Sequence, residues 1–341
     1  MKHYIKNLMV YMRRKKWPKI VLVLLALELG LRIFFPKLYS VTYYQSEKYV
    51  FIDFIKGYRE DPEVFWLPAD GFAHQIEAAR GYSGANLIYT FGGSIAYGAG
   101  ALESFSHYLR ILLNGSGRSG EVINFALPAY SSYQSLHLCR RICRSKVPQI
   151  VLLCNAFNDA SPFFNLTDRA AGERNKTWPI KTLYAMNRIK LFAAYRNLLL
   201  MGEHYLLSDS TRPAGQRTLV QRSPLPDYRQ NLMDFARLAR EEGFTLLLLT
   251  QPMPTVLNEK VVKPYFEVMA EVAQSEKNVY LVDIRPLFAA YRMEHHLDYL
   301  DRVHRTQDEL FYDTACHPTD LGHRLYAQAI YQSLVENNLL K

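Results

Sequence analysis

One serine stands where it could act as a nucleophile. The stretch YTFGGSIAYGAG, residues 89–100, runs from apolar residues through two glycines to Ser94. A serine hydroxyl attacks a carbonyl carbon when a turn exposes it, a base takes its proton and hydrogen-bond donors face the developing oxyanion. Gly92 and Gly93 would permit the tight turn from strand to helix that exposes such a serine. Most serines in turns only cap a helix or complete the turn, so Ser94 needs partners elsewhere in the chain.

Phosphate binding is the other chemistry that a glycine-rich stretch can serve. A phosphate loop of the form G-x-x-x-x-G-K-[ST] needs a lysine, and no lysine lies between Arg80 and Arg118. The dinucleotide fingerprint G-x-G-x-x-G needs a third glycine, which is missing after Gly98 and Gly100. The stretch therefore favours a nucleophile over a phosphate site.

Short apolar runs alternate with segments of helical spacing from Asn86 onward. The runs lie at residues 87–91, 122–127, 150–157, 244–251 and 279–284. The helical segments lie at about 102–112, 132–145, 228–243, 258–275 and 319–336. Apolar runs that alternate with helices are typical of parallel strands covered on both faces. The sequence therefore predicts an α/β fold with a central parallel sheet.

Functional groups in such a fold gather beyond the carboxyl ends of the strands. Three segments meet this condition: Ser94 after the first run, residues 127–132 after the second, and Asn158 after the third. We expect a site at this edge of the sheet.

Four blocks of the sequence resemble the motifs of the SGNH (GDSL-like) hydrolases, a superfamily of esterases and acyltransferases. In the family's order they are FGGSIAYG, INFALPAYSS, VLLCNAFNDAS and DTACHPTDLGHRLYAQAI. The resemblance covers Asn86 to the C-terminus, apart from an insertion at about 161–226. It implies a three-layer α/β/α fold of the SGNH/flavodoxin type and chemistry on acyl esters.

The resemblance also implies a role for each polar group. Ser94 would be the nucleophile, His317 its base and Asp313 the acid that orients the base. The oxyanion donors would be the backbone N–H groups of Ser94 and Ala129 and the side-chain amide of Asn158. No cofactor or metal is expected, and the chain has no H-E-x-x-H motif that would suggest zinc.

The chain departs from the family pattern at four places. Ala129 stands where glycine is usual, which keeps the N–H donor provided that the backbone does not need a positive φ. Ala156 also replaces a glycine, and Gly93 replaces the aspartate of G-D-S. Asp313 precedes His317 by four residues rather than three. A Ser–His dyad aided by a carbonyl group is therefore an alternative to the triad.

The positive charge of the chain is concentrated at its start. The formal net charge is +9, but residues 1–19 hold seven of the 41 Lys and Arg and no acid, which leaves +2 for the rest. A basic excess this local argues against a nucleic-acid partner. It precedes an apolar run at 20–35, interrupted by Glu28 and Arg32, which could pair on one helix face. This order predicts a transmembrane signal-anchor in the cytoplasmic (inner) membrane, with the rest of the chain outside in the periplasm or its equivalent; a cleaved signal peptide is the alternative.

These features divide the chain into three parts. Residues 1–38 form the cytoplasmic basic segment and the anchor, 39–84 a membrane-proximal extension, and 85–341 the hydrolase-like domain. Within that domain, the insertion at 161–226 contains a segment predicted to be helical at 181–207. An insertion of this length either packs on the flank of the domain or serves as a lid or acceptor surface.

We therefore expect a serine esterase that forms an acyl-enzyme on Ser94. It would remove O-acyl groups, most naturally O-acetyl groups, from an extracytoplasmic polysaccharide or glycolipid. The first alternative is an O-acyltransferase that uses the same residues, with a sugar hydroxyl as acceptor and a membrane protein partner that delivers the acyl donor. The second is a degenerate domain retained as a binding module.

Overall fold

The computed structural model describes residues 17–34, 58–68, 70–164, 166–186, 189–195, 220–301 and 303–341. The chain divides into two compact units. One takes in residues 1–71 and 174–217, and the other takes in residues 72–173 and 218–341. The second unit carries the predicted catalytic residues.

The centre of the second unit is a five-stranded parallel sheet with the order β4-β3-β5-β8-β9. In chain order, its strands are β3 (Asn86–Gly92), β4 (Gly120–Asn124), β5 (Ile150–Cys154), β8 (Thr245–Leu249) and β9 (Val279–Val282). Every residue of β3 and β5 is buried, which explains why these strands are almost continuously apolar rather than alternating. The predicted α/β fold with a central parallel sheet is confirmed.

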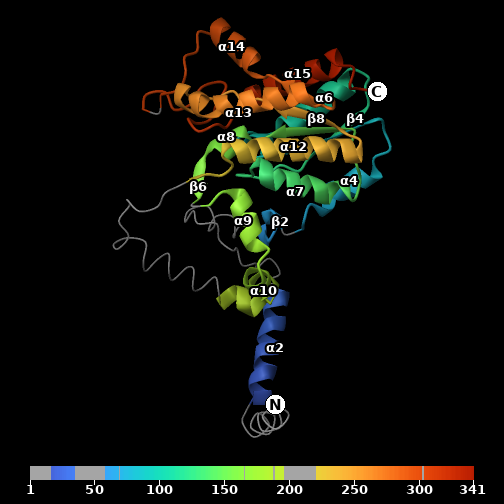
Figure 1. Cartoon of the computed structure of the whole chain (residues 1–341), viewed down its shortest axis with the longest axis vertical. Helices are drawn as coiled ribbons and strands as arrows, with labels where there is room; N and C mark the ends of the chain where they lie inside the picture. The colour runs from blue at the N-terminus through green and yellow to red at the C-terminus, as the bar shows by residue number, and fades with distance from the viewer. Residues whose placement is uncertain are drawn as a thin grey trace. The chain divides into compact units, whose positions relative to one another are not determined.

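Helices cover both faces of this sheet (Figure 1). On one face, α7 (Ser132–Cys143) packs on β3 and α12 (Leu225–Glu242) packs on β8. On the other, α6 (Phe105–Gly115) and α15 (Asp320–Glu336) pack against each other, α6 also on β4 and α15 on β9. The next helix in the chain after β8 is α13 (Val256–Ser275), which packs against α12 and β9.

The strand order places a switch point at β3. The chain leaves β3 for β4 on one side of it and later returns to β5 on the other side. Connections that run in opposite directions from neighbouring strands open a crevice at their carboxyl ends, where ligands of such folds bind. Ser94 follows β3 and Asn158 follows β5, so the predicted edge of the sheet is also the edge that the topology favours.

Several elements of this unit lie wholly or partly outside the predicted segments. They are α4 (Ala73–Gly81), α5 (Ser94–Tyr97), α8 (Ala156–Ala160), α9 (Asp168–Asn175), which continues past the boundary of the unit, α14 (Arg285–Glu294), and an antiparallel pair of short strands, β6 (Pro162–Phe164) and β7 (Val220–Gln221). The third apolar run, predicted as one segment over 150–157, is divided between β5 and α8. The β6–β7 pair joins the two ends of the insertion.

The first unit contains a hairpin of β1 (Tyr58–Asp61) and β2 (Phe65–Pro68), together with the helices α2 (Trp17–Phe34) and α10 (Trp178–Met186). Helix α10 covers the start of the segment predicted to be helical at 181–207, of which residues 187–188 and 196–207 lie outside the described residues.

Helix α2 coincides with most of the apolar run that we predicted to cross the membrane. Glu28 and Arg32 form the expected pair on it, with 2.6 Å between Arg32 Nη2 and Glu28 Oε1. Across the part of the chain that the structure describes, no helix is both long and apolar enough to span a bilayer. Most of the basic segment, residues 1–16, lies outside that part.

Candidate active site

Ser94 is the first residue of the short helix α5, just beyond the carboxyl end of β3. Two glycines precede it, and both positions lack room for a side chain. A Cβ on Gly92 would lie 2.5 Å from the carbonyl oxygen of Cys154, and a Cβ on Gly93 would lie 1.9 Å from Oδ1 of Asn158. Asn158 therefore occupies the space that a side chain at position 93 would need.

His317 reaches Ser94 from a loop far along the chain. Its Nε2 lies 2.9 Å from the Ser94 Oγ, and its Nδ1 lies 2.5 Å from Oδ2 of Asp313. The structure thus brings together the residues predicted to act as nucleophile, base and acid, in one hydrogen-bonded chain. A nucleophile bonded to a base that a third group orients is the arrangement that nucleophilic catalysis uses.

The turn around Asp313 accommodates the extra residue between the acid and the histidine. Asp313 Oδ1 accepts hydrogen bonds from the backbone N–H groups of residues 315–317, at 2.9, 3.1 and 3.3 Å. The chain wraps around this one oxygen, while Oδ2 faces the imidazole. A spacing of four residues is therefore compatible with an acid–histidine contact.

The contact between Asp313 and His317 changes the pKa values of both. Burial alone would raise the pKa of Asp313, but hydrogen bonds from the side chain and backbone of His317 outweigh it and lower the pKa to about 2. Burial would lower the pKa of His317, but its contacts with Asp313 and Cys316 outweigh that effect and raise the pKa to about 10. The carboxylate therefore favours the imidazolium, the form that His317 takes after it accepts a proton from Ser94.

Asn258 supports the same loop and was not identified from the sequence. Its Nδ2 donates to the carbonyl oxygens of Thr314 and Ala315, at 2.9 and 2.6 Å. Asn258 belongs to the first turn of α13 and is buried. No motif marks it, because its role depends on a loop 56 residues further along the chain.

Asn158 lies on α8, directly beyond the carboxyl end of β5, and is buried. The start of α8 is held from two sides: the Phe157 N–H donates to Gln251 Oε1 at 2.6 Å, and Asn155 Nδ2 donates to the Tyr130 carbonyl at 2.7 Å. These bonds keep Asn158 beside Gly93, next to the nucleophile. The other departure on α8 is harmless to the backbone, because Ala156 is not among the residues with a positive φ.

Ala129 has a φ of +60°, so the condition that we attached to this departure is not met. Left-handed backbone costs a non-glycine residue about 1 kcal/mol or more. The loop before it is tied to β3, because the Leu127 N–H donates to the Gly92 carbonyl at 3.1 Å. Among the described residues, no group accepts a hydrogen bond from the N–H of Ala129 or of Ser94. Both donors can therefore serve an oxyanion.

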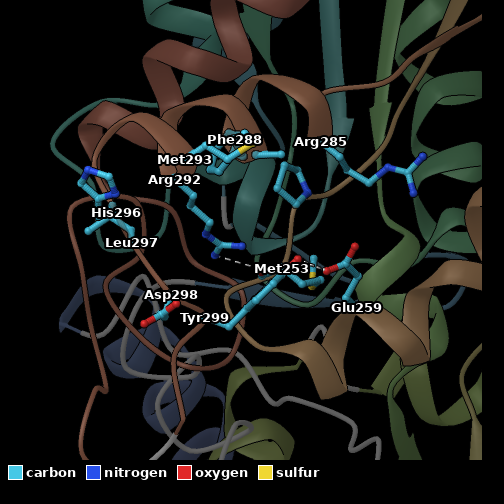
Figure 2. Close-up of a pocket in the computed structure, with 12 residues that line it drawn as sticks. Met253, Glu259, Arg285, Phe288, Arg292, Met293, His296, Leu297, Asp298 and Tyr299 are labelled. Carbon is cyan, nitrogen blue, oxygen red and sulfur yellow. Dashed lines mark hydrogen bonds between the residues drawn. The ribbon is translucent and has the colours of Figure 1, made fainter.

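A cavity of about 660 Å³ lies among the loop after β8, the start of α13, and α14 with the segment that follows it. Figure 2 shows its residues, with Arg292 reaching to the Met253 carbonyl, to which it donates at 3.3 Å. The Arg292 guanidinium also lies 4.2 Å from the centre of the Tyr299 ring, and the Tyr299 hydroxyl donates to Glu259. The lining is Pro252, Met253, Glu259, Arg285, Phe288, Ala289, Arg292, Met293, His296, Leu297, Asp298 and Tyr299.

This cavity shares a support with the predicted catalytic loop. Glu259, which lines the cavity, follows Asn258 in the first turn of α13. Asn258 in turn holds the carbonyls of residues 314 and 315, between Asp313 and His317. The cavity was not predicted from the sequence, because α14 was not.

Comparisons with known proteins give only distant structural similarities. No protein-family profile matches the chain, and no curated protein sequence matches it. Among solved structures, it is similar to LAE5, an alpha/beta hydrolase from the metagenome of Lake Arreo, with 14% identity over 76% of this chain and 98% of that one and a TM-score of 0.47.

Two further solved structures have similarly low sequence identities and TM-scores. A lipase/acylhydrolase from Enterococcus faecalis has 16% identity over 75% of this chain and 97% of its own, with a TM-score of 0.44. A catalytic mutant of Axe2, an acetylxylan esterase from Geobacillus stearothermophilus, has 13% identity over 74% and 95%, with a TM-score of 0.47. At these values the similarities assign no activity.

Proposed function

We propose that the chain is a serine esterase with Ser94 as its nucleophile. The observation that carries this proposal is the hydrogen-bonded chain from Ser94 Oγ through His317 to Asp313. His317 Nε2 takes the proton of the hydroxyl as Oγ bonds to the ester carbonyl carbon. Collapse of the tetrahedral intermediate expels the alcohol, which receives that proton, and leaves an acyl-enzyme. Water then attacks the acyl carbon by the same route and releases the acid.

The oxyanion of each intermediate needs donors on the far side of the carbonyl. We assign this role to the backbone N–H groups of Ser94 and Ala129 and to the side-chain amide of Asn158. The three belong to segments that follow β3, β4 and β5, which are adjacent strands. The absence of other acceptors for the two N–H groups among the described residues supports the assignment.

The experiment that tests the esterase proposal measures acetate release from p-nitrophenyl acetate by the full chain in detergent. Ser94→Ala should abolish enzymatic release. Ser116→Ala, an exposed serine at the end of α6, is the matched control and should keep the full rate. Equal rates for Ser94→Ala and the unmodified chain would refute the proposal and favour the alternative of a binding module.

For the substrate, we propose an O-acylated, hydroxyl-rich compound such as a surface polysaccharide or glycolipid. The cavity beside the catalytic loop supports this choice, because Arg292, Glu259 and Asp298 offer charged donors and acceptors beside the ring of Tyr299. A few polar groups in a partly apolar pocket orient a polar ligand.

The substrate proposal is tested with variants of the cavity. Arg292→Ala and Tyr299→Ala should raise KM for an O-acetylated oligosaccharide severalfold and leave hydrolysis of p-nitrophenyl acetate unchanged, since the small ester does not extend into the cavity. Arg324→Ala is the control, because Arg324 also lies over a tyrosine ring, that of Tyr108, at 5.2 Å. Unchanged KM values for the oligosaccharide would contradict the proposal.

An O-acyltransferase is the second candidate, since a sugar hydroxyl can replace water in the step that releases the acyl-enzyme. The same hydrogen-bonded chain of Ser94, His317 and Asp313 supports it, because transfer differs from hydrolysis only in the hydroxyl that attacks the acyl-enzyme. The assay adds an unacylated oligosaccharide to p-nitrophenyl acetate. Acetylated sugar in place of free acetate would identify a transferase, which in the cell would receive its acyl groups from a membrane protein partner.

We further propose that residues 1–38 anchor the chain in the cytoplasmic membrane, with the catalytic unit outside. The sequence order of a basic block at residues 1–19 before an apolar run at 20–35 supports this orientation. Membranes from cells that express the full chain should retain it after alkaline extraction, and protease added outside should digest the catalytic unit. Release by alkali or full protection would contradict the anchor or its orientation.

A further inference from the structure

A charged residue is fully buried behind the loop that carries Ala129. Arg222 follows β7 at the end of the insertion, and no part of its side chain is exposed. Its guanidinium donates to the Ala129 carbonyl and to Gln134 Oε1. It also pairs with Asp168, with Nη2 2.7 Å from Oδ2 and Nε 3.3 Å from Oδ1. The left-handed residue of the oxyanion loop is thus bonded directly to a buried cation.

Asp168 extends this contact to the start of α7. Its side chain is also fully buried, and its Oδ2 accepts a hydrogen bond from Ser131 Oγ at 2.5 Å. Ser131 caps α7 in a capping box with Gln134, the residue that Arg222 contacts. The Arg222–Asp168 pair therefore holds both the Ala129 carbonyl and the N-cap of α7, Ser131, two residues later.

The two charged residues come from opposite ends of the insertion. The Arg222 N–H donates to the Ser161 carbonyl at 3.3 Å, and the Asp168 N–H donates to the Arg222 carbonyl at 2.8 Å. These bonds continue the pairing of β6 with β7. Closing the insertion is thus what assembles the pair behind the loop.

Neither the pair nor the backbone of Ala129 is favourable alone. A buried ion pair is often no more stable than apolar residues of similar size, because both charges lose their hydration. An alanine at positive φ is strained. On the N-terminal side, Pro128 and the Leu127–Gly92 hydrogen bond restrain the backbone; on the C-terminal side, Arg222 restrains it through the carbonyl. Because Ala129 is restrained on both sides, its N–H keeps one direction despite the backbone strain.

We propose that Arg222, together with Asp168, is a positioning residue that holds the Ala129 N–H toward the oxyanion. This inference rests on the proposed esterase function. It also assigns a role to the insertion, whose ends supply both side chains. Because the oxyanion forms only during reaction, loss of Arg222 should lower kcat and leave KM nearly unchanged.

The test removes the pair without leaving a buried charge. Arg222→Met alone leaves the buried Asp168 carboxylate without its counter-charge and is expected to lower the free energy of unfolding strongly. The double variant Arg222→Met/Asp168→Leu removes both charges and should fold. Its kcat for p-nitrophenyl acetate should fall about 100-fold, the usual cost of one oxyanion donor, with KM changed less than about threefold.

Rescue by glycine separates positioning from general support of the fold. Ala129→Gly in the double variant removes the strain of the left-handed backbone and should restore kcat about tenfold. Leu113→Ala is the control for lost stability, because this fully buried leucine packs against Gly120, at the opposite end of the sheet. Assayed below its unfolding temperature, it should keep the kcat of the unmodified chain.

The outcomes distinguish this inference from the function on which it rests. A folded double variant with unchanged kcat overturns the positioning role, while loss of activity in Ser94→Ala would still uphold the esterase. A kcat loss that Ala129→Gly does not relieve, or that Leu113→Ala reproduces, also overturns it, since Arg222 would then act only on stability. If the unmodified chain shows no activity that depends on Ser94, both proposals fail.

Discussion

Asp313 contacts His317 twice: Oδ2 lies 2.5 Å from the ring Nδ1, and Oδ1 accepts a hydrogen bond from the His317 N–H at 3.3 Å. One carboxylate thus orients the imidazole and also shapes the backbone from which it projects. A dyad aided by a carbonyl, the alternative that the four-residue spacing left open, would need neither contact.

The first prediction concerns this acid. Asp313→Asn should lower kcat about 10³-fold or more, because an amide no longer stabilises the imidazolium or fixes the tautomer of His317. Asp301→Asn is the matched control, because Asp301 Oδ1 accepts hydrogen bonds from the N–H groups of residues 303–305 in a similar turn rather than from His317. Steady-state kinetics on p-nitrophenyl acetate measure both variants. A near-normal rate for Asp313→Asn would favour the dyad.

The second prediction concerns pH. His317 acts as a base only when it is neutral, and its contacts with Asp313 and Cys316 raise its pKa from 6.5 to about 10. The kcat/KM should therefore rise with pH through neutrality, with an apparent pKa above 6.5. In Asp313→Asn, the rise of kcat/KM should occur at lower pH, although the maximum kcat/KM is reduced. An apparent pKa of kcat/KM that is the same in the variant would show that Asp313 does not set the pKa of the base.

The predicted parts of the fold are those whose burial produces a continuous apolar pattern in the sequence. Strands β3 and β5 are buried on both faces, so their apolar runs were recognisable. Helix α14 was not, because only Phe288 of its residues is buried and no side chain caps its start. An element with one buried residue has no periodic pattern to detect.

The same distinction applies to the site. Ser94, Asn158 and His317 lie in motifs, and the structure places them together. Arg222 lies in no motif, and an isolated arginine in an insertion is usually exposed. Only its partner Asp168, 54 residues earlier, explains why it is buried. Side chains that act through pairing across an insertion cannot be found from local spacing.

The third prediction concerns the glycine before the nucleophile. Gly93→Ala should destabilise the protein by about 1–3 kcal/mol, the usual range for overpacking, and lower kcat, because the added Cβ would force Asn158 away. Gly115→Ala is the control, since a Cβ there meets nothing within 4 Å. Urea unfolding and steady-state kinetics measure the two effects. A fully active Gly93→Ala would contradict the assignment of Asn158 as an oxyanion donor.

The fourth prediction concerns the strained alanine in the otherwise unmodified chain. Ala129→Gly should raise the free energy of unfolding by up to about 1 kcal/mol, because glycine adopts positive φ without strain and loses part of that gain to its greater freedom when unfolded. Ala126→Gly, in the same loop but without a positive φ, should lower stability instead. Thermal unfolding distinguishes the two. Destabilisation by both variants would show that the Ala129 backbone carries no strain.

The fifth prediction concerns a buried histidine outside the site. His323 lies on α15 beside the stacked rings of Phe105 and Tyr326, and neither of its ring nitrogens has a partner among the described residues. Burial lowers its pKa from 6.5 to about 4, although Asp320 acts in the opposite direction. Between about pH 4 and pH 6.5, His323 is therefore protonated in the unfolded chain but neutral in the folded chain.

Stability should accordingly fall as the pH drops from about 6.5 to 4, by about 3 kcal/mol from this residue, and the effect should level off below pH 4. His323→Phe, which keeps an aromatic ring beside the stacked pair, should remove this part of the acid destabilisation. The control His296→Phe, which replaces an exposed histidine, should not. Urea unfolding at pH 4, 5.5 and 7 measures it. An equal loss of stability in His323→Phe and the unmodified chain would show that His323 does not take up the proton on unfolding.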